Sequence, residues 1–184
     1  NNRPTAWGIN VSGDEANTLD SGIHYFNQNV GTLGGGNITV NAGKDVQNLS
    51  IMLPTTGKPF GELSADVPNQ WVKNNTIVNG GGDLTLHADG DIVGGEYFVA
   101  RGQGTLYAGG SVTGSTDLNV GALLEVGDAT VNVNARQNVV IASVFNPTVL
   151  KQNVLLPNRI GDSRFFTYGE NSAVELGATA GNII

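Results

Sequence analysis

The chain has 184 residues, a formal net charge of −7 and no cysteine. The surplus of acidic residues argues against nucleic acid and anionic membrane surfaces as partners, because phosphate recognition needs an excess of Lys and Arg. The lack of cysteine excludes disulfides, thiolate catalysis and cysteine metal sites, and without an apolar run near about 18 residues we expect no membrane insertion.

The first regular element follows residues 1–30, which carry aromatic residues without a pattern and are expected to form a loop. The phrase GGGNITVNAGKDV then runs from Gly34 to Val46. Its apolar residues Ile38, Val40 and Ala42 alternate with polar ones, as in a strand with one buried face. Gly43 and Lys44 follow as a tight corner, and a second short apolar step begins at Val46.

The same phrase returns along the chain. GGGDLTLHADGDI spans Gly80–Ile92, and weaker copies are GTLYAGGSV at Gly104–Val112 and TVNVNARQNV at Thr130–Val139. An unfinished copy is expected to begin at Gly181. The proline-containing segments 54–72 and 145–170 do not fit the pattern, and we expect them to be loops extruded from corners, since proline is excluded from the interior of a sheet.

The alanine that ends each copy gives the repeat length. Ala42, Ala88, Ala108 and Ala135 are separated by 46, 20 and 27 residues. We interpret the spacing of 46 as two units, and the unfinished copy would place its alanine beyond the last residue, two further units after Ala135. The unit is therefore about 20 to 27 residues, a length typical of stacked repeat proteins.

A unit of this size cannot bury its apolar face alone, so identical units must stack with parallel strands. The sequence predicts an all-β solenoid with extruded loops, and glycine within the repeats argues against helices. Residues 1–184 are expected to be a single segment, a fragment of a much longer repeat protein. The predicted core consists of Ile38, Val40, Ala42, Leu84, Leu86, Ala88, Leu106, Ala108, Val131, Val133 and Ala135.

Two groups of polar residues are candidates for metal binding or catalysis. Asp83, His87, Asp89, Asp91 and Glu96 offer ligands for a divalent ion, but the first copy does not repeat them, which favours solvated corner carboxylates and no metal. A polysaccharide-active enzyme would need clustered carboxylates, and nothing in the spacing forces such a cluster. We therefore expect no enzymatic activity, no catalytic residue and no cofactor. The residues considered for a polysaccharide-cleaving reaction are Arg101, Arg136, Asp117, Glu125 and Asp128.

Aromatic side chains are the candidates for partner binding, and at least Tyr107 occupies an outward position of the repeat. Trp71, Tyr97 and Tyr107 are named because a flat ring can stack on the apolar face of a sugar, although aromatic side chains that only cover the wall are the commoner case. Thr39, Thr85 and Thr105 occupy one outward position in three copies, and we expect a threonine ladder that Asn132 interrupts.

The runs GGGNITVNAGKDVQNLSIMLPTTG, GGGDLTLHADGDIVGGEYFVARGQGTLYAGGSV and FFTYGENSAVELGATAGNI together resemble the large filamentous haemagglutinin-like exoproteins of Gram-negative bacteria. The resemblance implies a right-handed parallel β-helix, two-partner secretion through an outer-membrane partner, and a place at the cell surface or in the medium. Members of that family act as adhesins, in biofilm cohesion, or as stalks that carry a toxin, and their virulence roles depend on binding host or bacterial surfaces.

These observations lead to three hypotheses. The first is a non-enzymatic structural or adhesive segment in the shaft of a secreted surface fibre. The second is a carbohydrate-binding module that recognises a host or bacterial surface glycan or protein directly. The third is a β-helical polysaccharide lyase or hydrolase, which the residue pattern favours least.

Overall fold

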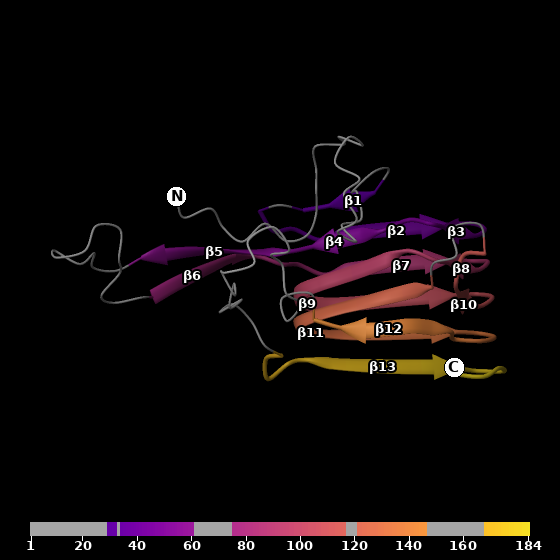
Figure 1. The fold of residues 1–184 in the computed structure, drawn as a ribbon. Coiled ribbons are helices and arrows are strands. Elements are labelled where there is room, and N and C mark those ends of the chain that lie inside the picture. The colour runs from indigo at the N-terminus through magenta and orange to yellow at the C-terminus, as the bar shows by residue number, and fades with distance from the viewer. Residues whose placement is uncertain (1–28, 33, 61–74, 117–120, 147–167) are drawn as a thin grey trace, which may run out of the picture.

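The computed structural model describes residues 29–32, 34–60, 75–116, 121–146 and 168–184. Of these residues, 61% are in strands and none is in a helix (Figure 1). The prediction of an all-β chain with parallel strands is confirmed. The strands are β1 Val30–Gly31, β2 Ile38–Ala42, β3 Val46–Gln47, β4 Ile51–Leu53, β5 Thr55–Phe60, β6 Asn75–Gly80, β7 Leu84–Ala88, β8 Ile92–Val93, β9 Glu96–Ala108, β10 Val112–Thr113, β11 Ala122–Ala135, β12 Ile141–Phe145 and β13 Ala173–Ala178.

The parallel strands form three ladders, which we call faces A, B and C. Face A is β2, β7, the ends of β9 and β11, and β13. Face B is β3, β8 and β10, extended by bridges at Val139 and Ile183. Face C is β1, β4, the starts of β9 and β11, and β12. The long strands β9 and β11 therefore serve faces C and A with their two halves.

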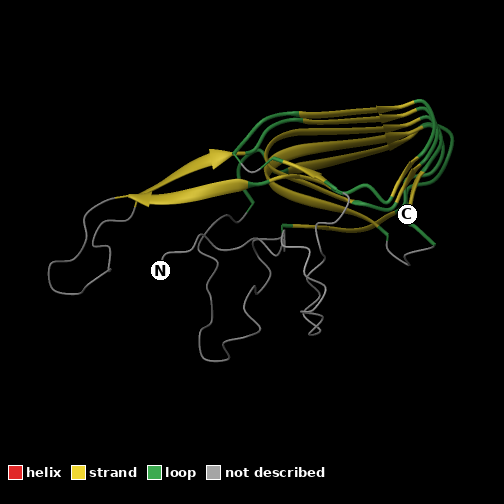
Figure 2. Cartoon of the chain, turned by 90° about the horizontal axis from the view of Figure 1, so that it is seen from above, coloured by secondary structure: helices red, strands yellow, loops and turns green. Residues whose placement is uncertain are grey.

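The chain passes from face C to face A to face B and then begins again one strand further along each ladder. Within the described residues this gives five levels, the first containing β1, β2 and β3 and the fifth containing β12, β13 and Ile183. Seen from above, the levels lie over one another (Figure 2). Each level alone has a small apolar face, and the neighbouring levels bury it.

The core lies between the faces and is built from columns of equivalent residues. Leu84, Leu86, Ala88, Leu106, Ala108, Val131, Val133 and Ala135 of the predicted core are buried on face A, and so is Ile38. Val40 and Ala42 are half-buried, because β2 pairs with β7 and with no other described strand. Faces B and C complete the core with columns that include Ile92 and Leu124.

Two predictions about the repeat length are wrong. The 46 residues between Ala42 and Ala88 are one level and not two, because β2 pairs directly with β7. The extra length is an antiparallel hairpin of β5 and β6, inserted between faces C and A and projecting from the stack (Figure 1). An insertion at a corner lengthens one level without disturbing the ladders on either side.

The last copy also differs from the prediction. Ala173–Ala178 pairs with Thr130–Ala135, so Ala178 is the alanine that ends the fifth copy. Ile183 bridges Val139 on face B and does not begin a new copy. The apolar residues Val174, Leu176 and Ala178 alternate along this strand. The repeat pattern does not predict the strand as a copy, because the polar phrase before it differs from the other copies.

Glycine is required at the corner between faces C and A. Gly36, Gly82 and Gly102 are equivalent in three successive levels and have φ values of 132°, 147° and 129°. A Cβ on Gly82 would also collide with the carbonyl oxygen of Gly36 in the level above. The repeated glycines of the sequence thus allow both a left-handed turn and the close approach of neighbouring levels.

Among the described residues there is no apolar helix long enough to cross a bilayer.

Candidate functional site

Face A presents two regular columns of outward side chains. The threonines Thr39, Thr85 and Thr105 are in register and exposed, and Asn132 takes the place of threonine in the fourth level, where the sequence predicted that the ladder is interrupted. The neighbouring column consists of Asn41, His87, Tyr107, Asn134 and Gly177. On the outer surface of face A, each side chain therefore lies beside the equivalent side chains of the levels above and below it.

Tyr107 lies in an outward position but uses one ring face within the protein. Its side chain is 41% exposed. The ring is stacked on His87, with centroids 4.9 Å apart and an interplanar angle of 4°. His87 Nδ1 lies 3.7 Å from Asp89 Oδ1. Because one face of Tyr107 is turned toward His87, the tyrosine does not offer both ring faces to a sugar.

Tyr97, a candidate for partner binding, does not lie at the surface. Its side chain is completely buried on face C, between Ile51 and Leu124 in register. The hydroxyl donates a hydrogen bond to the Gly94 carbonyl oxygen at 3.0 Å, and burial raises the pKa of the phenol. Tyr97 fills the core, where its hydroxyl finds the backbone partner that a buried tyrosine needs. Trp71 lies outside the described residues.

Two acidic residues of the second copy, Asp83 and Asp91, form hydrogen bonds to the levels on either side. At the corner between faces A and B, Asp45 Oδ1 accepts from the Asp91 N–H at 2.8 Å, and Asp91 Oδ1 accepts from the Ser111 N–H at 2.6 Å. The same contact recurs from Asn138 to Ser111 at 3.3 Å and from Asn182 to Asn138 at 2.9 Å. We call this chain of bonds the corner ladder.

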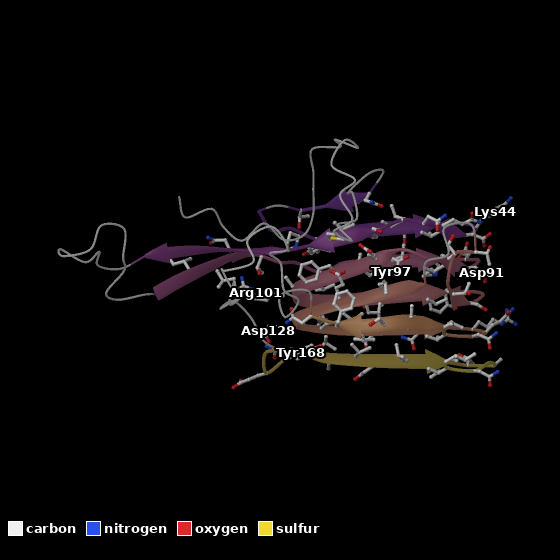
Figure 3. The ribbon with its side chains drawn as sticks, viewed as in Figure 1. Lys44, Asp91, Tyr97, Arg101, Asp128 and Tyr168 are labelled. Carbon is white, nitrogen blue, oxygen red and sulfur yellow. The ribbon has the colours of Figure 1, made fainter. Side chains whose placement is uncertain are left out.

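Asp83 has a comparable role at the start of face A. Its N–H donates to Asn37 Oδ1 at 2.8 Å, and its own Oδ1 accepts from the Gln103 N–H at 2.9 Å. Asp91 lies at the other end of the strand (Figure 3), and Glu96 belongs to the next level on face C. In the described part of the chain, no three His, Asp or Glu side chains lie close enough to hold a metal ion.

Of the residues considered for a polysaccharide-cleaving reaction, only some lie close together. Arg101 and Asp128 are neighbours in register, but Arg136 follows the far end of β11. Arg101 donates to the Gly80 carbonyl oxygen at 3.4 Å, and Asp128 accepts from the backbone and side chain of Asn171 at 3.1 and 3.2 Å. Both contacts stabilise the corner between faces C and A. Asp117 lies outside the described residues.

Glu125 is the most unusual ionisable group of the described residues. It lies on the outward side of face C, in register with Phe98 and Phe145, and is only 9% exposed. Burial, together with the charge of Glu96, raises its pKa to about 7. The run ALLEVG places this glutamate among apolar residues, and such a run indicates a strand that is buried on both faces. Met52 and Phe98 are buried on the same side.

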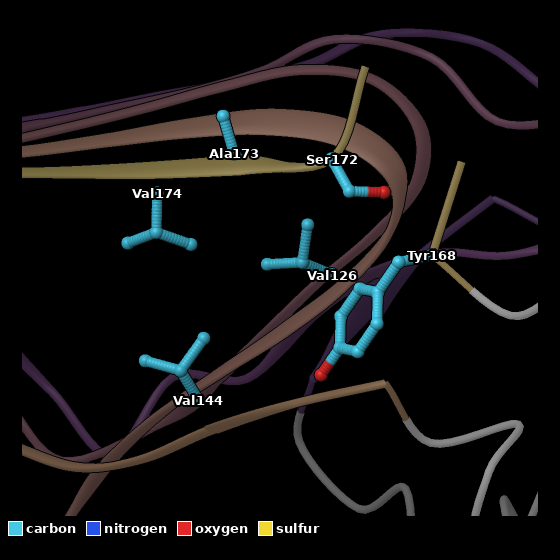
Figure 4. A pocket seen from close by; sticks show the side chains of 6 residues that line it. All are labelled: Val126, Val144, Tyr168, Ser172, Ala173 and Val174. Carbon is cyan, nitrogen blue, oxygen red and sulfur yellow. The ribbon is translucent and has the colours of Figure 1, made fainter. Parts of the chain in front are cut away.

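One pocket lies at the fifth level (Figure 4). Its volume is about 190 Å³, and it is lined mainly by apolar side chains: Val126, Val144, Tyr168, Ser172, Ala173 and Val174. The Ser172 hydroxyl already donates to the Gly127 carbonyl oxygen at 2.6 Å. The lining contains no carboxylate, imidazole or amine, so it has neither a general base nor a charged ligand for a substrate.

No known family model matches this chain, and no curated protein or solved structure is detectably similar to it.

Proposed function

We propose that this chain is a segment of the shaft of a secreted bacterial surface fibre and that its stacked levels form a right-handed parallel β-helix. The segment would be exported through an outer-membrane secretion partner and would project an adhesive or effector region away from the cell. Its role is mechanical, and it needs neither a cofactor nor a reaction.

The observation that carries this proposal is the coupling of every level to the next by the same contacts. Parallel ladders on the three faces, the corner ladder and the aliphatic columns all repeat along one axis. Each level advances the stack by about 4.8 Å, the spacing of paired strands. Length then grows in proportion to the number of levels, which is what a shaft requires.

The right-handed arrangement is supported by the chirality of parallel crossovers. A strand that leaves one position in a ladder and returns to the next parallel position does so almost always with a right-handed connection, because strands twist in that sense. The faces are joined through the chain at the corners, so a β-helix of this kind does not need hydrogen bonds between its faces. An experimental density map of the purified chain reveals the hand directly.

Export and surface exposure are supported by composition as well as by the resemblance. Only 14% of the residues are charged, against about 25% in a typical domain, and the polar surface consists of Asn, Thr, Ser and Gly. Such a chain has no cysteine to form premature disulfides during export.

Immunogold labelling of intact cells tests the location. Antibodies raised against the purified chain should label the outer surface or shed fibres of cells that produce the parent protein. Labelling seen only after the cells are permeabilised would contradict the proposal. Antibodies against a cytosolic protein of the same cells serve as the control for membrane integrity.

Direct carbohydrate recognition is the second candidate because the stacked side chains of Tyr107 and His87 are 41% and 42% exposed on a polar wall. A glycan array probed with the purified chain tests it. Saturable binding that is lost in Tyr107→Ala and kept in Thr39→Ala, on the same wall two levels away, would favour this function over a purely mechanical one.

A further inference from the structure

The sequence contains one Asn-Gly pair, Asn79–Gly80, and it lies where the β5–β6 hairpin joins the stack (Figure 1). An asparagine side chain can react with the backbone nitrogen of the residue that follows it. Glycine favours this reaction, because it has no Cβ to block the approach. Asn79 is exposed, so its side-chain amide is open to water. The pair is therefore a candidate site of spontaneous chemical modification.

The backbone nitrogen of Gly80 is turned away from the partner strand. The Gly81 N–H donates to the Pro54 carbonyl oxygen at 2.9 Å. Hydrogen-bonded and non-hydrogen-bonded pairs alternate along an antiparallel ladder, so Gly80 and Thr55, the next pair, exchange no hydrogen bond. The Gly80 nitrogen can thus approach the Asn79 side chain without first breaking a bond to β5.

The backbone around Gly80 can rearrange at low cost. Gly80, Gly81 and Gly82 have φ values of 90°, 81° and 147°, and glycine changes readily between such conformations. Ring closure requires Asn79 to leave its pair with Thr56. Strands β5 and β6 form a separate two-stranded sheet, and such a sheet is marginally stable by itself. Local opening of the hairpin at this point therefore gives access to the reactive conformation.

Arg101 places a positive charge beside the same peptide group. Its Nη2 donates to the Gly80 carbonyl oxygen at 3.4 Å, and the arginine is exposed near the base of the hairpin (Figure 3). The Gly80 nitrogen must lose its proton before it attacks, and a nearby cation stabilises the anion that results. Arg101 therefore favours the reactive form of Gly80 without taking part in the covalent step.

The other residues that could form the same ring are held more firmly. In the Asp89–Gly90 pair, the Gly90 N–H donates to the Lys44 carbonyl oxygen at 3.1 Å. Asn41 and Asn134 lie in the parallel ladders of face A, and each precedes an alanine. Asn79 thus differs from them both in the residue that follows it and in the strand that holds it.

We propose that Asn79–Gly80 is a self-modifying site, at which the Gly80 nitrogen closes a succinimide ring on Asn79, assisted by the charge of Arg101. The deprotonated nitrogen forms a bond to Asn79 Cγ, the bond from Cγ to Nδ2 breaks, and ammonia leaves with a proton taken from water. Water then opens the ring at either carbonyl and gives aspartate or isoaspartate. Neither an oxidant nor a reductant takes part, and water is the co-reactant.

The products change the base of the hairpin in two ways. Each conversion adds one negative charge to a chain whose formal net charge is −7, and it places that charge near Arg101. Isoaspartate also inserts an extra carbon atom into the backbone of β6, which shifts the pairing of this strand with β5. The attachment of the hairpin therefore changes as the protein ages, and this holds wherever the parent protein is located.

Peptide mapping by mass spectrometry tests the site on the purified, folded chain kept at pH 8 and 37 °C. The peptide with Asn79 should gain one mass unit at least about tenfold faster than the peptides with Asn41 and Asn134, because Asn79 alone combines a following glycine with a strand that opens. Asn79→Gln should abolish the gain. Conversion of Asn79 no faster than that of Asn41 would overturn the proposal.

Variants of Arg101 test the assistance by its charge. Arg101→Gln should lower the rate of conversion by about threefold, since one charge is removed at a short distance in water, and Arg101→Lys should restore most of the rate. Arg136→Gln removes a charge beyond the far end of β11 and is the matched control, which should convert like the parent. Circular dichroism checks that each variant is folded. A folded Arg101→Gln protein that converts as fast as the parent would overturn the role of the arginine.

Discussion

Single residues of this protein are constrained most strongly where levels approach one another. Gly82 has a positive φ and no room for a Cβ beside the level above it. Gly43, by contrast, lies at an open corner, where the nearest atom to an added Cβ is 3.9 Å away. Glycine is thus abundant for two different reasons, and only one of them is structural necessity.

Gly82→Ala should destabilise the protein by at least about 1–3 kcal/mol, because an alanine adopts this φ only with strain and its methyl group displaces the Gly36 backbone. Urea unfolding followed by circular dichroism measures the change. Gly43→Ala is the control and should change the free energy of unfolding by less than about 1 kcal/mol. Equal effects of the two substitutions would contradict the assignment of the corner.

Glu125 should make the stability fall as pH rises. Its pKa is about 7 in the folded protein and near 4.5 when unperturbed. Between these values the folded state binds more protons than the unfolded state, so the free energy of unfolding decreases with pH, by roughly 3 kcal/mol in total. Glu125→Gln should remove most of this decrease. Urea unfolding at pH 5 and pH 8 provides the test, and an unchanged slope in the variant would show that the carboxyl is not responsible.

At the scale of elements, short strands gain their order from neighbours in the next level. Strands of two residues, such as β3 and β8, would not persist alone, but they pair in register with one another and lie beside the corner ladder. The ladder supplies an acceptor for a backbone N–H that turns away from regular pairing. Asp83 and Asp91, two of the residues considered as metal ligands, thus order the corners.

Asp91→Ala should cost about 1–3 kcal/mol, because the Ser111 N–H loses a charged acceptor in a partly buried position. Asp91→Asn keeps an acceptor oxygen and should cost less. Asp89→Ala is the control, since its side chain is 65% exposed. Thermal melts rank the three variants by stability. An Asp91→Ala protein as stable as Asp89→Ala would show that the corner ladder does not stabilise the fold.

At the scale of the whole molecule, the stack tolerates insertions because they leave at corners. The β5–β6 hairpin projects from the stack (Figure 2), and its base is the paired residues Thr55 and Gly80. The strands on either side, β4 and β7, keep their own ladders. The hairpin is therefore an appendage that can vary without changing the stack.

Replacing residues 56–79 with an Asn-Gly turn should leave the stack folded. The turn closes the Thr55–Gly80 pair in the usual two-residue geometry, and shortening a surface loop carries a small entropic effect. The melting temperature should change by less than about 5 °C. A chain that lost its cooperative transition would show that the hairpin is part of the folding unit.

The sequence alone determined the strand alternation, the parallel stacking and most of the inward residues. These features depend on local periodicity, and each level repeats the same pattern of Leu84, Leu86 and Ala88. The repeat count was wrong because spacing along the chain does not distinguish two levels from one level that carries an insertion. Only the pairing of β2 with β7 decides this.

The tertiary structure also decides which candidate site residues are exposed and which partners they meet. Tyr97 and Tyr107 lie in one strand, yet one is buried in the core and the other is exposed, because the strand bends from face C to face A between them. Asp83 and Asp91 became corner acceptors because the next level brings a backbone N–H to each. Periodicity gives the side of a strand on which a residue lies, whereas the partner it meets depends on which level stacks against it.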